Sequence, residues 1–153
     1  MTNIQIPKYN RKCFVIMPFS KTKGKHDANY WTNFYEEFIV KALKNCGYDA
    51  YKSVANLNTI AKDIIQQLAS SDIVLAVLTD SNANVFYELG VRHCLHRGTI
   101  MILEEGKRAP FDIGQHGILF YRSTDSGYDL SSFTEDLKVW IQKAEKMQED
   151  NLV

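Results

Sequence analysis

The side chains between residues 80 and 88 combine a carboxylate that could act on a substrate with polar groups that could hold it. Glu88 follows Asp80, Asn82 and Asn84 in the segment Ser71 to Gly98, which reads SDIVLAVLTDSNANVFYELGVRHCLHRG. An ionised Glu can attack or stabilise a sugar cation, and a protonated Glu can donate its proton to a leaving group. The same residue types also occur at helix starts for structural reasons, so both roles are open at this point.

The position of Glu88 in its helix decides which form of its carboxyl is favoured. We expect Asn84 to cap a helix that begins at Val85, which places Glu88 in the first helical turn. There the helix dipole would stabilise the ionised carboxylate by a few tenths to about 1 kcal/mol. Burial in a pocket would instead raise the pKa of Glu88.

Two apolar runs predict the strands that place these side chains. Ile73 to Leu78 is unbroken and apolar, which is typical of a parallel strand covered on both faces. Lys12 to Phe19, which reads KCFVIMPF, predicts a first strand. Open α/β sheets bind ligands at the carboxyl ends of their strands. We therefore expect Met17 to Ser20 and Asp80 to Glu88 to line one crevice.

The remaining elements alternate along the chain. Apolar spacing predicts helices from Tyr30 to Cys46, around Ile60 to Ser70, and from Ser132 onward, where Ser132 and Glu135 form a capping box. Further strands are expected at Tyr48 to Ser53, Thr99 to Leu103 and Gly117 to Tyr121. This order predicts a three-layer, doubly wound α/β fold with a mainly parallel five-stranded sheet of flavodoxin-like order 2-1-3-4-5.

Composition indicates one domain without a strong net charge. The chain has 153 residues, 45% of them hydrophobic, with 18 basic and 18 acidic side chains. We expect a single domain over residues 1–153, with residues 1–11 and 148–153 flexible. Balanced charge argues against direct nucleic-acid binding. Because no apolar run approaches the roughly 20 residues that span a bilayer, we expect no membrane segment and a cytoplasmic location.

Cysteine and histidine spacing does not predict a metal centre. Cys13, Cys46 and Cys94 are odd in number and share no metal-type spacing, so we expect reduced thiols. His93, Cys94 and His96 lie near a predicted helix end without a matching set elsewhere. We therefore expect no metal and no cofactor.

Two segments resemble a known set of proteins. CFVIMPF at Cys13 to Phe19 and the segment from Ser71 to Leu95, with its Glu88-Leu89-Gly90 step, are similar to the nucleoside 2-deoxyribosyltransferase family and its TIR-like relatives. The resemblance implies that Glu88 is the catalytic carboxylate. In the transferases this Glu attacks the anomeric carbon of a deoxyribonucleoside, and in TIR-type enzymes it supports cleavage of the nicotinamide–ribose bond of NAD. Both reactions break an N-glycosidic bond.

This chemistry assigns roles to the other residues at the crevice. We expect Glu88, Asp80 and Asn82 to be catalytic. The expected substrate-binding residues are Met17, Phe19, Ser20, Asn84, Phe86 and Asp72. Met17, Phe19 and Phe86 could form an apolar wall for a base, and Asp72 matches an acidic position of the family. The expected ligand is a nucleoside, a nucleotide or NAD, with NAD as a substrate rather than a cofactor. Related sites borrow residues from a neighbouring subunit, which implies a homo-oligomer.

A second interpretation is a binding module that keeps the crevice without turnover. Such a module would sense a nucleotide or signal through assembly, as TIR-like domains do. Val77 stands where relatives carry an acidic residue in the strand, and Asn82 stands where transferases carry Asp, which favours this alternative. Asn can hydrogen-bond a hydroxyl but cannot take a proton. The set of Glu88, Asn84 and Asp80 favours the enzyme.

Overall fold

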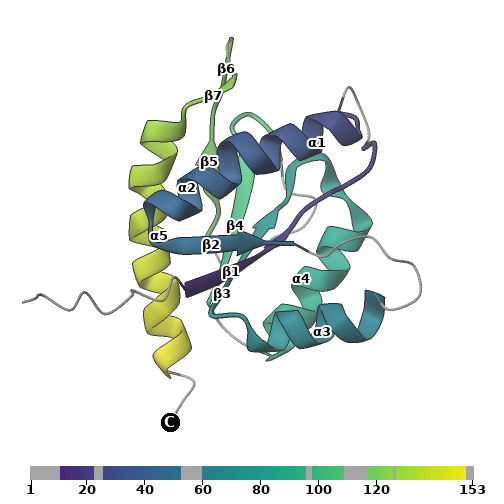
Figure 1. The fold of residues 1–153 in the computed structure, drawn as a ribbon, viewed down its shortest axis with the longest axis vertical. Helices are drawn as coiled ribbons and strands as arrows, with labels where there is room; N and C mark the ends of the chain where they lie inside the picture. The colour runs from purple at the N-terminus through teal and green to yellow at the C-terminus, as the bar shows by residue number, and fades with distance from the viewer. Residues whose placement is uncertain are drawn as a thin grey trace, which may run out of the picture.

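The protein folds as a central β-sheet with helices on both faces (Figure 1). The computed structural model describes residues 11–22, 26–52, 60–95, 98–108, 117–125 and 127–150. The strands are β1 (Arg11–Ile16), β2 (Tyr48–Tyr51), β3 (Ile73–Val77), β4 (Thr99–Glu104), β5 (Leu119–Tyr121), β6 (Ser123–Thr124) and β7 (Gly127–Tyr128). The helices are α1 (Ala28–Phe34), the π-helical segment η1 (Tyr35–Ile39), α2 (Val40–Asn45), α3 (Ile60–Ser70), the 3-10 turn η2 (Thr79–Ser81), α4 (Ala83–Leu95) and α5 (Leu130–Asp150).

The main sheet has the predicted topology. Its five strands are all parallel and follow the order β2-β1-β3-β4-β5, which confirms the flavodoxin-like α/β fold. Every residue of β3 is buried, as its unbroken apolar run predicts. Leu75 pairs with Val15 of β1 on one side and with Ile100 of β4 on the other. Strands β1 and β3 are therefore neighbours, and the ligand-binding position of this topology lies beyond their carboxyl ends.

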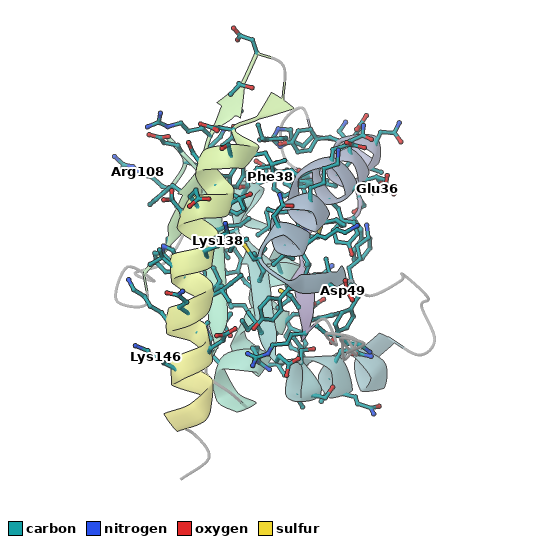
Figure 2. The ribbon with its side chains drawn as sticks, turned by 60° about the vertical axis from the view of Figure 1, so that its left-hand side comes forward. Glu36, Phe38, Asp49, Arg108, Lys138 and Lys146 are labelled. Carbon is teal, nitrogen blue, oxygen red and sulfur yellow. The ribbon has the colours of Figure 1, made fainter. Side chains whose placement is uncertain are left out.

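Successive strand residues face two separate cores, because side chains alternate across a strand. Val15, Leu75 and Ile102 belong to the larger core, which the helices α1, η1, α2 and α5 cover. The smaller core includes Ile16 and Ala76 and lies under α3 and α4. Figure 2 shows α5 beside the α1–α2 helical segment with Phe38 between them, where its ring lies 4.7 Å from that of Phe133.

Two helix starts differ from the prediction. Asp27 caps α1, where its Oδ1 accepts a hydrogen bond of 2.8 Å from the Tyr30 amide, so the helix begins at Ala28. Asp129 precedes α5, and its Oδ1 accepts from the Ser132 amide at 3.2 Å. The predicted capping box of Ser132 and Glu135 is therefore wrong. Aspartate caps helices as well as serine does, and an Asp three residues before Ser132 leaves Ser132 inside the first turn.

The ends of some strands differ from those of the predicted apolar runs. β1 ends at Ile16 rather than at Phe19, because Pro18 has no N–H for a sheet ladder. A short antiparallel hairpin of β6 and β7, with two residues in each strand, follows β5 and was not predicted. Of the ends expected to be flexible, Arg11 begins β1 and residues 148–150 continue α5, whereas residues 1–10 and 151–153 lie outside the described residues. None of the described helices is both long and apolar enough to cross a membrane.

Candidate functional site

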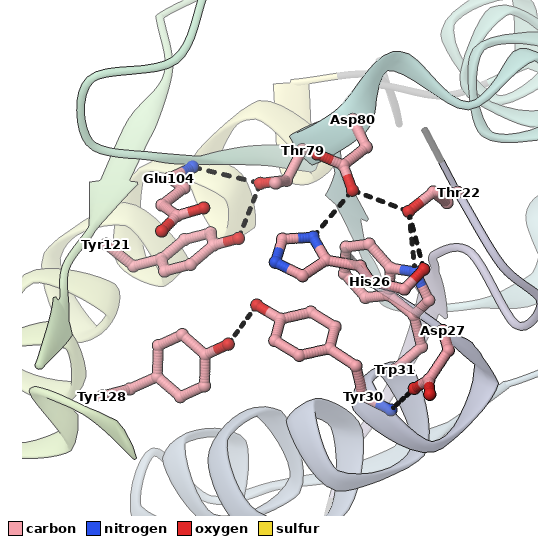
Figure 3. A network of polar contacts seen from close by, with 10 residues as sticks. All are labelled: Thr22, His26, Asp27, Tyr30, Trp31, Thr79, Asp80, Glu104, Tyr121 and Tyr128. Carbon is pink, nitrogen blue, oxygen red and sulfur yellow. Dashed lines mark hydrogen bonds and ion pairs between the residues drawn. The ribbon is translucent and has the colours of Figure 1, made fainter. Parts of the chain in front are cut away.

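Polar side chains join the segments that follow β1 and β3, at the carboxyl edge of the sheet. The Thr22 hydroxyl donates a 2.6 Å hydrogen bond to Oδ2 of Asp80, and Nδ1 of His26 lies 2.7 Å from the same oxygen (Figure 3). The Trp31 indole N–H donates to Thr22 Oγ1 at 3.2 Å. One carboxylate oxygen of Asp80, which follows β3, thus bonds two side chains of the segment that follows β1.

The backbone at Asp80 is unusual for residues other than glycine. Asp80 has φ 68° and Ser81 has φ 52°, both in the left-handed region. This conformation costs roughly 1 kcal/mol for most residues and is best tolerated by Asn and Asp. The strained turn directs the Asp80 carboxylate to Thr22 and His26, and those two hydrogen bonds help to offset its cost.

The contact with Asp80 also fixes the imidazole of His26. A carboxylate can only accept, so Nδ1 carries the hydrogen of this contact and Nε2 is the ring nitrogen on the far side of the imidazole from Asp80. The ring stacks on Tyr30, with centroids 3.7 Å apart and planes 9° from parallel. Residue 26 lies 54 positions before Asp80, and no sequence spacing indicated the pair. Neither His26 nor Thr22 was among the site residues predicted from the sequence.

A second set of polar groups lies beside His26. Oγ1 of Thr79 contacts the Tyr121 hydroxyl at 2.6 Å and accepts a 3.1 Å hydrogen bond from the Glu104 amide. The hydroxyls of Tyr30 and Tyr128 contact each other. In Figure 3 the three tyrosines and His26 point toward one another, with the Glu104 carboxylate beside Tyr121.

The tyrosines of this set are held in their neutral form. Burial is the main cause that raises the pKa of Tyr30 and of Tyr121 above the ordinary value of 10, and nearby Glu104 acts in the same direction. Both hydroxyls therefore remain O–H donors across the physiological pH range. Neutral donors next to a carboxylate are groups that hydrogen-bond hydroxyl-rich molecules.

Asn82, not Asn84, caps the helix that carries Glu88. Oδ1 of Asn82 accepts from the Asn84 amide at 3.0 Å and from the Val85 amide at 3.2 Å, and α4 begins at Ala83. The prediction that Asn84 caps the helix is wrong. The turn at residues 80 and 81 makes the helix begin two residues earlier than predicted, so its first backbone amides lie within reach of the Asn82 side chain. No acidic residue lies in the first turn of α4, so Glu88 is in the second turn.

Burial, rather than the helix dipole, determines the proton affinity of Glu88. Val85 and Leu89 of α4 face the smaller core, and Glu88 is half-buried between them on the helix. This burial raises the pKa of the carboxyl from its ordinary value of 4.5 to about 7. The cost of burying the charge is therefore larger than the stabilisation of the ionised form expected from the helix dipole. At neutral pH the carboxyl is present in both forms, so it could act as a nucleophile or as a proton donor.

The other predicted substrate residues are distributed unevenly. Met17 is buried, whereas Phe19 is 44% exposed and Ser20 is exposed after β1. Phe86 is half-buried on α4.

The two remaining predicted residues lie beyond opposite ends of β3. Asn84 is exposed at the start of α4. Asp72 precedes the amino end of β3, where its Oδ2 accepts from the Lys12 amide at 3.2 Å. About 16 Å of strand therefore separates Asp72 from the edge that carries Asp80.

Among the described residues, no group of three His, Cys, Asp or Glu side chains could hold a metal ion, and His96 lies outside them. A scan of protein-family models finds no match to this chain, and a search of curated proteins finds none either.

Proposed function

We propose that this protein cleaves or transfers at the N-glycosidic bond of a nucleoside, a nucleotide or NAD, with Glu88 acting on the sugar. The observation that carries the proposal is the half-buried carboxyl of Glu88, whose pKa burial raises to about 7, on the helix that leaves the carboxyl end of β3. Ligands bind at this position in open α/β sheets. The similarity of the Glu88-Leu89-Gly90 step to deoxyribosyltransferase-like and TIR-like proteins supports the same chemistry.

The carboxyl suits a reaction in which positive charge develops on a sugar. Breaking an N-glycosidic bond passes through an oxocarbenium-like state at the anomeric carbon. A carboxylate in partly desolvated surroundings attracts that charge more strongly than one in water. Burial raises the pKa of Glu88 because it disfavours the ionised form. The positive charge of the transition state would favour that ionised form. Glu88 is then the nucleophile or the stabiliser of the sugar cation.

The polar groups around His26 at the carboxyl edge of the sheet are proposed to hold the sugar. His26 Nε2, the Tyr30 and Tyr121 hydroxyls and the Glu104 carboxylate could bind ribose or deoxyribose hydroxyls. Asp80 orients His26 in this assignment, because its Oδ2 is already bound by Thr22 and His26. Phe19 and Phe86 remain the proposed apolar wall for the base.

A non-catalytic nucleotide-sensing or assembly module is the second candidate. It is favoured by the hydrogen bonds of Asn82, whose Oδ1 is used to cap α4. Two of the three expected catalytic residues, Asp80 and Asn82, thus have structural contacts that explain their presence. In either function a homo-oligomer and a cytoplasmic location stay predictions.

Base release distinguishes the two candidates. Purified wild type, Glu88→Gln and the exposed control Glu36→Gln are incubated with NAD and with ribo- and deoxyribonucleosides, and the freed base is separated by chromatography. An enzyme loses release by about 100-fold or more in Glu88→Gln and keeps it in the control. Ligand binding by calorimetry without release by any of the three proteins would reject catalysis on this panel and favour the sensing module.

A further inference from the structure

A groove separate from the His26–Asp80 site runs along the last strand of the sheet. It has a volume of about 860 Å³ and lies between β5 and the amino-terminal half of α5. Residues 118–122 form one wall and residues from Ser131 to Trp140 form the other, and Glu105 and Gly106 also line the groove. A groove with a strand on one side and a helix on the other has the shape that accepts an extended peptide segment.

The strand wall offers backbone hydrogen-bonding groups. In the described part of the chain, β5 pairs with β4 alone and ends the sheet. The Tyr121 carbonyl accepts a 2.8 Å hydrogen bond from the Glu105 amide, so Tyr121 directs its backbone groups toward β4. Backbone groups alternate in direction along a strand, and the N–H and C=O of Phe120 therefore point to the outer edge. Such an edge is a template for another strand.

The negative charge of the groove indicates which kind of segment it binds. Its lining contains four carboxylates, from Glu105, Asp129, Glu135 and Asp136, and one guanidinium, from Arg122. Arg122 is paired with Glu105 at 2.5 Å and Lys138 with Glu135 at 3.2 Å, so the negative charge left to attract a partner is that of Asp129 and Asp136. A second copy of this chain would bring the same negative edge and be repelled. A segment rich in Lys or Arg would be attracted.

Apolar surface in the groove is suited to alternate side chains of an extended segment. Trp140 is half-buried and packs on Gly117, where an added Cβ would lie 2.9 Å from its ring. This close approach holds the indole in place. Phe120 is 48% exposed and alternates with Leu119 and Tyr121, which face the core under α5, so its ring lies on the opposite face of the sheet. Side chains of a bound strand point to opposite faces in turn, so basic and apolar residues would alternate.

We propose that the groove between β5 and α5 binds a basic, extended peptide segment of a partner protein, which adds as a strand to the edge of β5. The segment hydrogen-bonds the outward N–H and C=O of Phe120. Its Lys or Arg side chains face Asp136 on α5, and its apolar side chains lie on the opposite face, beside Phe120. This inference is independent of the proposed glycosidic chemistry.

Fluorescence anisotropy with defined peptides tests the proposal on the full chain. The probe is a labelled hexapeptide of alternating lysine and valine, compared with its glutamate–valine counterpart and with a version whose alternate amides are N-methylated. We expect the lysine peptide to bind, and both other peptides to bind at least about fivefold more weakly. Equal binding of the N-methylated peptide would overturn strand addition, as would complete competition by spermine, a polyamine without a peptide backbone.

Two substitutions locate the binding. Phe120→Pro removes the outward N–H, which an edge strand tolerates, and Phe120→Ala removes the side chain but keeps that N–H. We expect Phe120→Pro to bind the lysine peptide about fivefold more weakly than Phe120→Ala. Asp136→Lys should weaken binding about threefold or more, whereas Glu36→Lys, on η1, should leave it unchanged. Equal affinities within both pairs, or no binding of the lysine peptide, would refute the proposal.

Discussion

Replacing Glu88 by Gln should raise the free energy of unfolding at higher pH and leave it nearly unchanged at low pH. Glutamine keeps the size of the side chain and removes its charge. The folded carboxyl holds its proton up to about pH 7, whereas the unfolded chain releases it near the ordinary value of 4.5. Between these values the folded state binds more protons than the unfolded state. The free energy of unfolding of the wild type therefore falls as pH rises from about 4.5 to about 7, and stays low above that.

The size of the effect follows from the shift in pKa. Each pKa unit corresponds to about 1.4 kcal/mol, so the shift to about 7 would destabilise the wild type by about 3 kcal/mol at pH 8. Because Glu88 is partly exposed, solvent screening reduces the expected value to about 2 kcal/mol. For a chain of this length, that difference raises the melting temperature of Glu88→Gln by about 4–8 °C.

Thermal and urea unfolding at a series of pH values from 4.5 to 8.5 measure this difference. The stability gain of Glu88→Gln over the wild type should be small near pH 4.5, grow through neutral pH and level off above pH 7.5. Glu36→Gln, which removes an exposed carboxylate, should show no such pH-dependent gain. A variant no more stable than the wild type at pH 8 would refute the conclusion that burial raises the pKa of Glu88.

Three further substitutions test other parts of the structure. Gly90→Ala should raise stability by about 0.5–1 kcal/mol in urea unfolding, because a Cβ there meets no atom within 4 Å and alanine favours helix; a loss of stability would contradict this. Arg92→Met should lower stability by about 2–4 kcal/mol, since the buried guanidinium donates to the carbonyls of Leu68 and Ser71, and a loss below about 1 kcal/mol would show that these bonds matter little. Thr79→Val should cost about 1–3 kcal/mol by leaving the Tyr121 hydroxyl and the Glu104 amide without their partner, whereas Thr79→Ser, which keeps the hydroxyl, should stay near the wild type in the same assay.

The topology could be predicted because apolar runs carry it. Ile73 to Val77 is a strand buried on both faces, and this pattern alone indicates a parallel sheet. Short polar elements leave no such pattern. The two-residue strands β6 and β7 are held by the contact of Tyr128 with Tyr30, 98 positions earlier in the chain.

The candidate site was predicted only in part. Its place at the carboxyl edge follows from the strand order, and Glu88 follows from its motif. The cap was misplaced because Asn82 and Asn84 are chemically equivalent, and the left-handed backbone at Asp80 decides between them. The imidazole of His26 meets Asp80 only once β1 and β3 are neighbours, so local sequence contains no signal for that pair.

The measurement that tests the proposed chemistry most directly is the pH dependence of base release by the wild type, with Glu88→Gln beside it. If ionised Glu88 acts on the sugar, kcat/KM for release from NAD or a nucleoside should rise with pH and level off above an apparent pKa of about 7, and Glu88→Gln should lose the activity. Release that continues in Glu88→Gln with an unchanged pH profile would contradict the assignment of Glu88 as the catalytic carboxylate.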